Sequence, residues 1–396
     1  MSDLTLMEAL ELINAQVINQ TFSPEEISFA DSAGRLLAVD LHWDRDHPPY
    51  NRAAMDGYAF PGQPEPKSVW PIIGLSRAGE PFPDHVPPFK CIKIATGAVV
   101  PDSCDTVIPW EKTEVCDSSV TVVNQVQSGA NIHRKGSDRK RGQVALPKGT
   151  KLTAAHIAIL STIGAVTVKV QPRVRVSLLS TGSEIVPIEA TPRPDQIRAS
   201  NFYTLKSLLD RHPGVSLKHA DFLEDDFQTL LSWFKTSEPD TDCFIVTGGV
   251  GTSEFDFVPR LSSEMGYKTI LHGLAIKPGH PLFLARKGNR FILGLPGNPV
   301  SSTACYSMFA QRLFSHFLNL PMMSFDLFEA GDDLMNKGKR LLMRPVYTVG
   351  KRIYPVEWNG SGDITALAKV DGFALIEPKS TIKTGCDARF FALEAS

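Results

Sequence analysis

Three glycine-rich polar loops each follow a short apolar run, and their residues could bind an anion. The loops span residues 181–184, 247–254 and 295–299. In an open parallel sheet, loops at the carboxyl ends of the strands converge, and the helices that follow point their N-termini at the gap between them. Backbone N–H groups at such helix starts bind phosphate and other oxyanions. The pattern therefore predicts a site for a phosphate-bearing ligand.

Two further features favour an anion at the same edge. Asn298 and Pro299 are typical of a helix start, with asparagine as the N-cap and proline at the first helical position, although capping alone would explain them equally well. Lys277 precedes Pro278, and a residue before proline is pushed towards extended backbone. Beside an anion site this lysine would act as a positive clamp, and elsewhere it would be a solvated surface residue.

Carboxylates gather at the same loops. Glu184 follows the first apolar run, Asp225 and Asp226 open a helical pattern, and Glu254 and Asp256 follow the second loop. Mg²⁺ takes oxygen ligands and bridges phosphates, so this group of carboxylates suits Mg²⁺. Each residue taken alone could instead be a favourable charge at a helix N-terminus.

The elements that must position these residues alternate regularly. Between the apolar runs lie helical patterns at about 198–211, 225–235, 256–265 and 300–318. This alternation predicts a central parallel α/β sheet, covered on both faces, over residues 173–320. The glycines at 248–251 lack the G-x-G-x-x-G spacing, which argues against a classical NAD site.

The rest of the chain predicts three further domains. Residues 45–140 are rich in proline and glycine between short β-forming runs, which indicates a β-rich lid domain. Residues 1–44 and 141–172 each carry a helical pattern, and we expect the two helices to pack together as one discontinuous linker domain. Residues 321–396 return to short strands and turns, which predicts a small C-terminal β-barrel.

Bulk composition excludes several classes of protein. The 396 residues are 42% hydrophobic and 21% charged, and 41 basic residues nearly balance 43 acidic ones, so nucleic acid is not an expected partner. No run of about eighteen apolar residues occurs and the first residues are acidic, so we expect a cytoplasmic protein without a membrane span or secretory signal. The six cysteines form no Cys-x-x-Cys pair, and we expect buried, reduced thiols.

Motifs along nearly the whole chain resemble the MoeA family of molybdopterin molybdenumtransferases, which includes the gephyrin E domain. HPPYNRAAMDGYAF at 47–60 is similar to PPFDNSAMDGYA, and NIHRKGSD at 131–138 is similar to N-I-R-x-x-G-E-D. The segment IATGAVVPDSCDTVIPWE resembles TGA-P-x-G-A-D-x-V-V, LLSTGSEIV resembles STGDEL, and VTGGVGTSEFDF resembles SGGVSVGEYDF. Finally, AIKPGHP and GLPGNPVSS resemble KPGKP and GLPGNPVS.

This resemblance implies an activity and an assembly. The family inserts molybdate into adenylylated molybdopterin with Mg²⁺, and it releases AMP and the finished molybdenum cofactor. It forms homodimers whose active site lies between the α/β domain of one subunit and the β module and C-terminal barrel of the other. A molybdopterin adenylyltransferase and molybdoenzyme maturation factors are the implied partners.

The resemblance also implies roles for individual residues. The implied catalytic residues are Asp56, Thr96, Asp138, Glu184, Asp225, Asp256 and Lys277. Glu184, Asp225 and Asp256 are the implied metal ligands. The implied cofactor-binding and substrate-binding residues are Thr181, Gly182, Ser183, Gly248, Gly249, Ser253, His280, Pro296, Gly297, Asn298, Pro299, Arg344 and Ser361. Lys277 and Arg344, with the Ser361 hydroxyl, predict a cradle for the molybdate dianion.

Several positions depart from the family pattern, among them Gly136-Ser-Asp138 in place of G-E-D and Gly251-Thr-Ser-Glu254 in place of the S-V-G-E step. Ser183 replaces a carboxylate, and Gly273 and His280 stand where relatives tend to carry lysine. These changes remove or weaken charge near the predicted anion site, although His280 could still gain a proton. They leave open two alternatives to an active transferase: a non-catalytic paralogue that binds molybdopterin or a maturation partner as a scaffold, and a hydrolase of another pyrophosphate-containing nucleotide.

Overall fold

The structure is a computed structural model that describes residues 4–17, 22–253, 256–318, 320 and 325–394. Glu254, one of the carboxylates noted above, lies outside the described residues. The chain divides into two compact units. Unit 1 comprises Met1–Glu26, Gly34–Ala38 and Lys169–Ser396, and unit 2 comprises Ile27–Ala33 and Val39–Val168.

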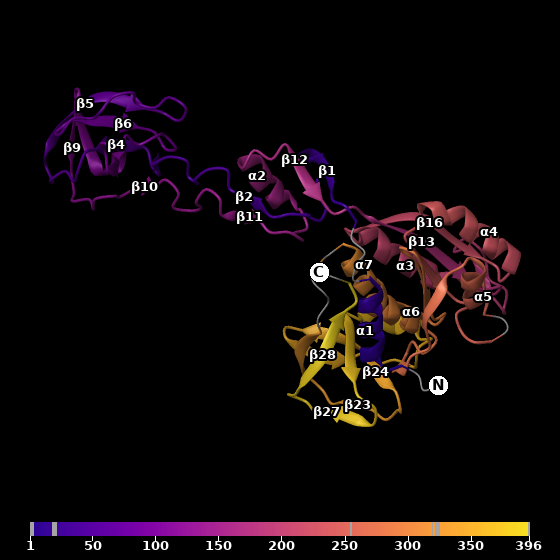
Figure 1. Ribbon diagram of the computed structural model, residues 1–396. Helices are drawn as coiled ribbons and strands as arrows, with labels where there is room; N and C mark the ends of the chain where they lie inside the picture. Colours follow the sequence, from indigo (N-terminus) through magenta and orange to yellow (C-terminus); the bar gives the residue numbers. More distant parts are fainter. Residues whose placement is uncertain (1–3, 18–21, 254–255, 319, 321–324, 395–396) are drawn as a thin grey trace. The chain divides into compact units, whose positions relative to one another are not determined.

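The core of unit 1 is a six-stranded sheet in the order β16-β13-β17-β21-β20-β18 (Figure 1). Its strands are β16 (Val215–Leu223), β13 (Val174–Thr181), β17 (Cys243–Thr247), β21 (Arg290–Leu295), β20 (Phe283–Lys287) and β18 (Lys268–His272). The first four are parallel, as predicted, but β20 and β18 are antiparallel to their neighbours. A tight turn at Gly288 joins β20 to β21, and a turn this short permits only antiparallel pairing.

Helices cover both faces of this sheet, and they lie where the sequence pattern predicts them. They are α1 (Leu6–Val17), α3 (Ser200–Arg211), α4 (Phe227–Ser237), α5 (Phe257–Glu264), α6 (Pro299–Cys305) and α7 (Gln311–Phe317), with the π-helical turn η4 (Tyr306–Ala310) between the last two. Ile245 packs in one hydrophobic cluster with α1, α3, α6 and α7, whereas Phe244 and Val246 pack in another with α4 and α5. Alternate side chains of the strand thus serve opposite layers.

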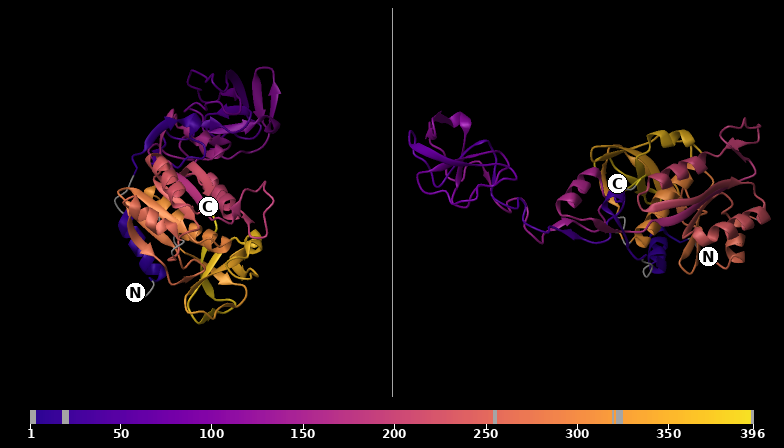
Figure 2. Two further views of the ribbon diagram at one scale, coloured as in Figure 1. Left: turned by 90° about the vertical axis from the view of Figure 1, so that its right-hand side faces the viewer. Right: turned by 90° about the horizontal axis from the view of Figure 1, so that it is seen from above.

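The predicted C-terminal barrel is present in unit 1. Its strands are β24 (Leu341–Val349), β25 (Arg352–Pro355), β22 (Asp326–Ala330), β28 (Asp387–Ala392) and β26 (Gly372–Ile376), and β26 pairs back onto β24 to close the barrel (Figure 2). The short strand β19 (Ile276–Lys277) pairs in parallel with β24. The segment that carries Lys277 is therefore bound directly to the barrel.

Unit 2 contains the predicted β-rich module. Its six-stranded sheet has the order β7-β4-β6-β5-β9-β8, with β7 (Thr106–Pro109), β4 (Gly57–Phe60), β6 (Cys91–Ile94), β5 (Val69–Ser76), β9 (Ser119–Val122) and β8 (Thr113–Cys116). Within the part of the chain that the structure describes, the remaining short strands are β1 (Glu25–Ser28), β2 (Leu41–His42), β3 (Arg52–Ala53), β10 (Ile132–His133), β11 (Val144–Leu146), β12 (Thr167–Val170), β14 (Ile185–Val186), β15 (Ile197–Arg198), β23 (Leu334–Asn336) and β27 (Ser380–Ile382). The 3₁₀ helices in the same part are η1 (Phe29–Asp31), η2 (Trp110–Lys112), η3 (Glu238–Asp240) and η5 (Ile364–Lys369).

The predicted packing of the first helix against the second is wrong. Thr5 and Glu8 form a reciprocal capping box at the start of α1, and the helix then buries Leu10 and Ile13 in the core of unit 1 beside α7 and β18. The second helix, α2 (Ala154–Thr162), belongs to unit 2. An amphipathic stripe shows that a face is buried but does not identify its partner.

Two further expectations concern the burial of the cysteines and the presence of a membrane-spanning helix. Cys91, Cys104, Cys243 and Cys305 are buried as predicted, and burial raises the pKa of Cys91 and Cys104 to about 12. Cys116 and Cys386 are exposed, contrary to prediction. None of the described helices is both long enough and apolar enough to span a membrane.

The packing of α1 predicts unequal effects of two substitutions in the same helix. Ile13→Ala removes a fully buried side chain and should lower the free energy of unfolding of unit 1 by about 2–5 kcal/mol. Met7→Ala changes a side chain that is 49% exposed and serves as the matched control, with an expected change within about 0.5 kcal/mol. Urea unfolding followed by circular dichroism measures both, and equal effects would show that α1 is not part of this core.

Candidate active site

The three glycine-rich loops meet, as the sequence predicts, and Gly248 is the point of closest approach. Gly248 has φ +94°, and a Cβ atom there would lie 2.2 Å from the Thr181 carbonyl oxygen. Its N–H donates to the carbonyl of Leu295 at 3.3 Å, and the Thr247 hydroxyl donates to the carbonyl of Pro296 at the same distance. Only a glycine fits at this position, because any side chain would push the first two loops apart.

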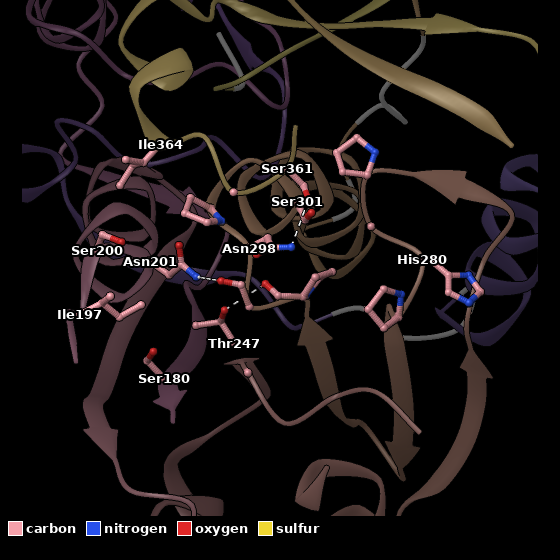
Figure 3. A pocket seen from close by; sticks show the side chains of 18 of the residues that line it. Ser180, Ile197, Ser200, Asn201, Thr247, His280, Asn298, Ser301, Ser361 and Ile364 are labelled. Atoms are coloured by element: carbon pink, nitrogen blue, oxygen red, sulfur yellow. Dashed lines mark hydrogen bonds between the residues drawn. The ribbon is translucent and has the colours of Figure 1, made fainter. Parts of the chain in front are cut away.

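A cavity of about 860 Å³ lies where these loops meet the barrel. That volume suits an organic ligand. Many of the residues expected to bind substrate line it: Thr181, Glu184, Gly248, Lys277, His280, Pro296, Gly297, Asn298, Pro299 and Ser361. Figure 3 shows Asn298 and Ser361 near the middle of the cavity wall, between Asn201 and His280.

Lys277 supplies one cation to this wall. The residue ends β19 in extended backbone, as the following proline predicts, and its side chain is exposed. The ammonium group forms no ion pair with any residue that the structure describes. After Pro278 the chain turns at Gly279, where φ is +110° and a Cβ atom would lie 2.4 Å from the Sγ atom of Cys305. The glycine thus lets the lysine-bearing segment pack closely on α6.

Two of the departures from the family pattern lie in one hydrogen-bonded loop. The Nδ1 atom of His280 lies 2.8 Å from the carbonyl oxygen of Leu274, and the Leu274 N–H donates to the His280 carbonyl at 2.9 Å. Gly273 has φ +87°, in the left-handed region that favours glycine. A lysine at position 273 would therefore be strained in this backbone conformation.

Asn298 occupies the predicted N-cap position of α6, but its side chain does not cap the helix. Instead the Asn298 Nδ2 group donates to the hydroxyl of Ser361 at 3.1 Å (Figure 3). The N–H of Val300 donates to the Ser361 carbonyl at 3.0 Å, so one of the N–H groups expected to meet a ligand is already used. The start of α6 is held to the barrel through Ser361.

The charges around the cavity favour an anion. Among the described residues that line it, Arg198, Lys277 and Arg340 are cationic, and Glu184 is the one carboxylate. None of the three cations forms an ion pair with another described residue. Unpaired cations beside a closed wall attract anionic ligands more strongly than they would in open water.

Arg344 does not line the cavity, contrary to its predicted place in the anion cradle. Its Nη2 group donates to the carbonyl of Val356 at 2.9 Å, and its guanidinium lies 5.6 Å from the ring centre of Trp358, which does line the cavity. Burial lowers the pKa of Arg344. Arg344 supports the wall from behind, and Arg340 supplies the cation at its surface.

The predicted metal ligands do not form one cluster. Thr181 donates through its hydroxyl to Asp225, while Asp256 accepts hydrogen bonds from the Ser253 N–H at 2.8 Å and the Ser253 hydroxyl at 2.6 Å. Burial raises the pKa of Asp256, but the hydrogen bonds from Ser253 outweigh it and the pKa is lowered overall. Within the described ranges, no group of three or more His, Cys, Asp or Glu residues could hold a metal ion.

Comparison with known proteins identifies the family. Residues 4–164 match the family model for the MoeA N-terminal region (domain I and II), and residues 177–316 match that for a probable molybdopterin binding domain. A molybdopterin molybdenumtransferase of Synechocystis sp. is 31% identical over 385 residues, which cover 93% of this chain and 94% of that protein. One of Haemophilus influenzae is 30% identical, with 78% and 77% covered. This chain belongs to the MoeA family.

A solved MoeA structure agrees with this assignment. The molybdopterin biosynthesis MoeA protein of Pyrococcus horikoshii is 25% identical and matches with a TM-score of 0.83, and the match covers 100% of both chains. The barrel residues Trp358 and Ser361 line the same cavity as the α/β loops of their own chain. The expected contribution of a second subunit to the site stays a prediction.

Three predicted MoeA site residues lie in unit 2. The Asp56 carboxylate accepts the Thr96 N–H at 2.7 Å, so the structure brings these two residues together. The N–H groups of Asp138 and Arg139 both donate to the carbonyl of His47 at 3.0 Å, which joins Asp138 to the start of the 47–60 motif. Their catalytic roles stay predictions.

The sequence prediction and the structure differ on which residues line the cavity. The predicted residues of unit 1 that do not line the cavity are Gly182, Ser183, Asp225, Gly249, Ser253, Asp256 and Arg344. Lining residues that sequence reasoning missed include Arg198, Ser200, Asn201, Ser301, Arg340 and Trp358. The pair Ser200 and Asn201 at the start of α3 was the available signal, because backbone N–H groups at a helix start can bind an anion.

The meeting of the loops predicts that Gly248→Ala is more damaging than a matched glycine substitution. Gly266→Ala is the control, because Gly266 also has positive φ but has no atom within 4 Å of the Cβ position. The control should cost about 1–2 kcal/mol of unfolding free energy, from backbone strain alone. Gly248→Ala should cost a further 1–3 kcal/mol, roughly, from overpacking. Urea unfolding measures both, and equal losses would contradict the close contact with Thr181.

Proposed function

We propose that this protein is a molybdopterin molybdenumtransferase, which inserts molybdate into adenylylated molybdopterin and releases AMP and the molybdenum cofactor. Family membership supports the reaction class. The observation that carries the proposal for this chain is the cavity charge: three unpaired cations against one carboxylate among the described lining residues. Both substrates are anionic, and such a cavity would bind them.

Molybdate is a tetrahedral dianion, and Lys277 and Arg340 are the cations that would hold it. The Ser361 hydroxyl accepts a hydrogen bond from Asn298, so its own proton stays available to donate to an anion oxygen. Charge-assisted hydrogen bonds of this kind are the strong ones. Asn298 and the N–H of Val300 fix the position of Ser361 and so prepare this donor before the anion binds.

The chemical step needs no protein nucleophile. Water attacks the adenylate phosphorus through its oxygen, the anhydride P–O bond to the pterin phosphate breaks, and AMP and the pterin monophosphate form with release of a proton. If a molybdate oxygen attacks instead, the pterin phosphate leaves and the adenylyl-molybdate formed releases AMP and molybdate when water attacks its phosphorus. The protein would contribute by holding the reacting groups together and by neutralising charge that builds on the phosphate oxygens. The cations of the cavity wall can serve this purpose.

Mg²⁺ would be held by Glu184 and Asp225. Mg²⁺ commonly uses only one or two protein carboxylates, together with water and substrate phosphates, so the lack of a preformed cluster among the described residues fits this ion. Glu184 lines the cavity, and Asp225 is hydrogen-bonded to the lining residue Thr181. Bound there, the ion would supply positive charge to the phosphates. Asp256 is engaged by Ser253 and would instead keep its loop in place.

The departures from the family pattern favour an active enzyme over a non-catalytic scaffold. Ser183 does not line the cavity, so the carboxylate missing there is not missing from the wall. The lysines absent at Gly273 and His280 leave Lys277, Arg198 and Arg340 as cations. The site thus keeps the charge that an oxyanion needs.

We also propose that the protein acts in the cytoplasm as a homodimer. The resemblance of the sequence motifs to the MoeA family supports the dimer, with a molybdopterin adenylyltransferase as the proposed source of substrate and molybdoenzyme maturation factors as the proposed recipients of the product. Light scattering coupled to size-exclusion chromatography measures the assembly, and a monomer across the micromolar range would contradict it.

Lys277→Ala should abolish the activity. Full-length protein, adenylylated molybdopterin, Mg²⁺ and molybdate should release AMP, and the variant should release it at least about a hundredfold more slowly, because an oriented charge at the reacting anion is lost. Lys268→Ala is the matched control, since Lys268 is exposed and does not line this cavity. Molybdopterin binding without AMP release by the wild type would favour the scaffold, and turnover of another nucleotide without molybdate would favour the hydrolase.

Substitution of Arg340 should affect molybdate binding, whereas substitution of Arg344 should affect the stability of the barrel. Arg340→Gln should raise the KM for molybdate about 10- to 100-fold through loss of a charged hydrogen bond, with little change in melting temperature. Arg344→Gln should mainly lower barrel stability, by about 1 kcal/mol, because it loses the bond to Val356 and the contact with Trp358. Steady-state kinetics and thermal unfolding separate the two, and a larger KM effect at Arg344 would contradict the assignment of Arg340.

A further inference from the structure

Arg198 lies on a backbone that is fixed on both sides. It belongs to β15, which pairs in parallel with β14, and its register partner is Val186. The N–H of Ile197 donates to the Glu184 carbonyl at 2.9 Å, and the N–H of Ala199 donates to the Val186 carbonyl at 3.1 Å. The main chain of Arg198 is therefore held against the segment that begins with Glu184.

The guanidinium of Arg198 donates hydrogen bonds to described residues through Nε alone. Its Nε atom donates to the carbonyls of Ile188 at 3.0 Å and Ala190 at 3.2 Å. The two Nη groups have no hydrogen bond or ion pair to any described residue, and Glu184 on the adjoining segment does not neutralise them. Because the guanidinium is planar and rigid, anchoring Nε also sets the direction of the Nη groups. Arg198 is one of the residues that line the cavity.

The segment around residues 197–200 and the segment that carries Lys277 line the cavity at different places. Figure 3 shows Ile197, the neighbour of Arg198 in the chain, on one side together with Ser200, and His280 on the other side. Asn298 and Ser361 lie between them. The cavity therefore offers cationic groups at two places, which suits a ligand with two separate anionic groups.

We propose that Arg198 binds a phosphate group of the substrate and so determines specificity for a phosphorylated ligand. The proposal rests on the proposed function for the identity of that ligand, which carries one phosphate on its nucleotide part and one on its pterin part. A guanidinium with both Nη groups unused matches two phosphate oxygens in a bidentate contact, which a lysine ammonium cannot reproduce. Lys277 and Arg340 remain for the molybdate oxygens on the other side.

Binding measurements on the full chain test this role. Isothermal titration with AMP, with adenosine and with molybdopterin is carried out on the wild type and on Arg198→Gln, Arg198→Lys and Arg193→Gln. Arg193 is the matched control, because it lies five residues earlier in the chain, pairs with Asp195 at 3.1 Å and does not line the cavity. Arg198→Gln should weaken binding of AMP or of molybdopterin about 10- to 100-fold, with adenosine unchanged. Arg198→Lys should fall between, and Arg193→Gln should match the wild type.

The outcomes separate the possible phosphates. Loss confined to AMP assigns Arg198 to the nucleotide phosphate, and loss confined to molybdopterin assigns it to the pterin phosphate. Unchanged affinity for both ligands overturns the proposal, and so does a loss that extends equally to adenosine, because that would report a disturbed cavity. A wild type that binds these ligands but releases no AMP with molybdate would refute the proposed reaction while leaving the result for Arg198 readable.

Discussion

The backbone of Gly248 lies so close to the carbonyl of Thr181 that no side chain fits between them, and this contact determines where the cavity wall lies. Parallel strands bring the loops to one edge of the sheet, but only a glycine lets them touch. The Gly248 N–H then binds the end of β21, which places the start of α6. Moving any one loop outward would separate the residues that face the ligand.

The barrel depends on the same arrangement. Asn298 and Val300, at the start of α6, both donate hydrogen bonds to Ser361, and β19 pairs with β24 immediately beside Lys277. Two covalently distant parts of unit 1 are thus joined at the points where they contribute to the cavity. The cost is electrostatic, because the cations around this cavity form no ion pair with any described residue and repel one another until an anion binds. Such a cost is expected at a binding site and would serve no purpose in a structural core.

Sequence reasoning succeeded where a local pattern has a single physical meaning. An apolar run followed by a glycine-rich loop predicts a strand ending at the ligand edge, and all three loops meet there. It failed where the outcome depends on which neighbour a residue meets. Arg340 immediately precedes the barrel strand β24 and Arg344 lies within it, and only the three-dimensional structure shows that Arg344 turns towards Trp358. The partner of α1 and the side-chain bond of Asn298 are failures of the same kind.

The altered lysine positions show how one site can keep its chemistry with a different set of charges. At residue 273 the backbone has φ +87°, so a lysine there would have to overcome strain of about 1–2 kcal/mol before it could bind anything. At residue 280 the ring is tied to the Leu274 carbonyl, which makes it part of the loop that supports Lys277. The cations at 198 and 340 reach the cavity from a separate strand and from the barrel, where no such backbone constraint acts. Charge at an anion site is a property of the whole wall, so a motif that has lost one lysine does not by itself predict a lost activity.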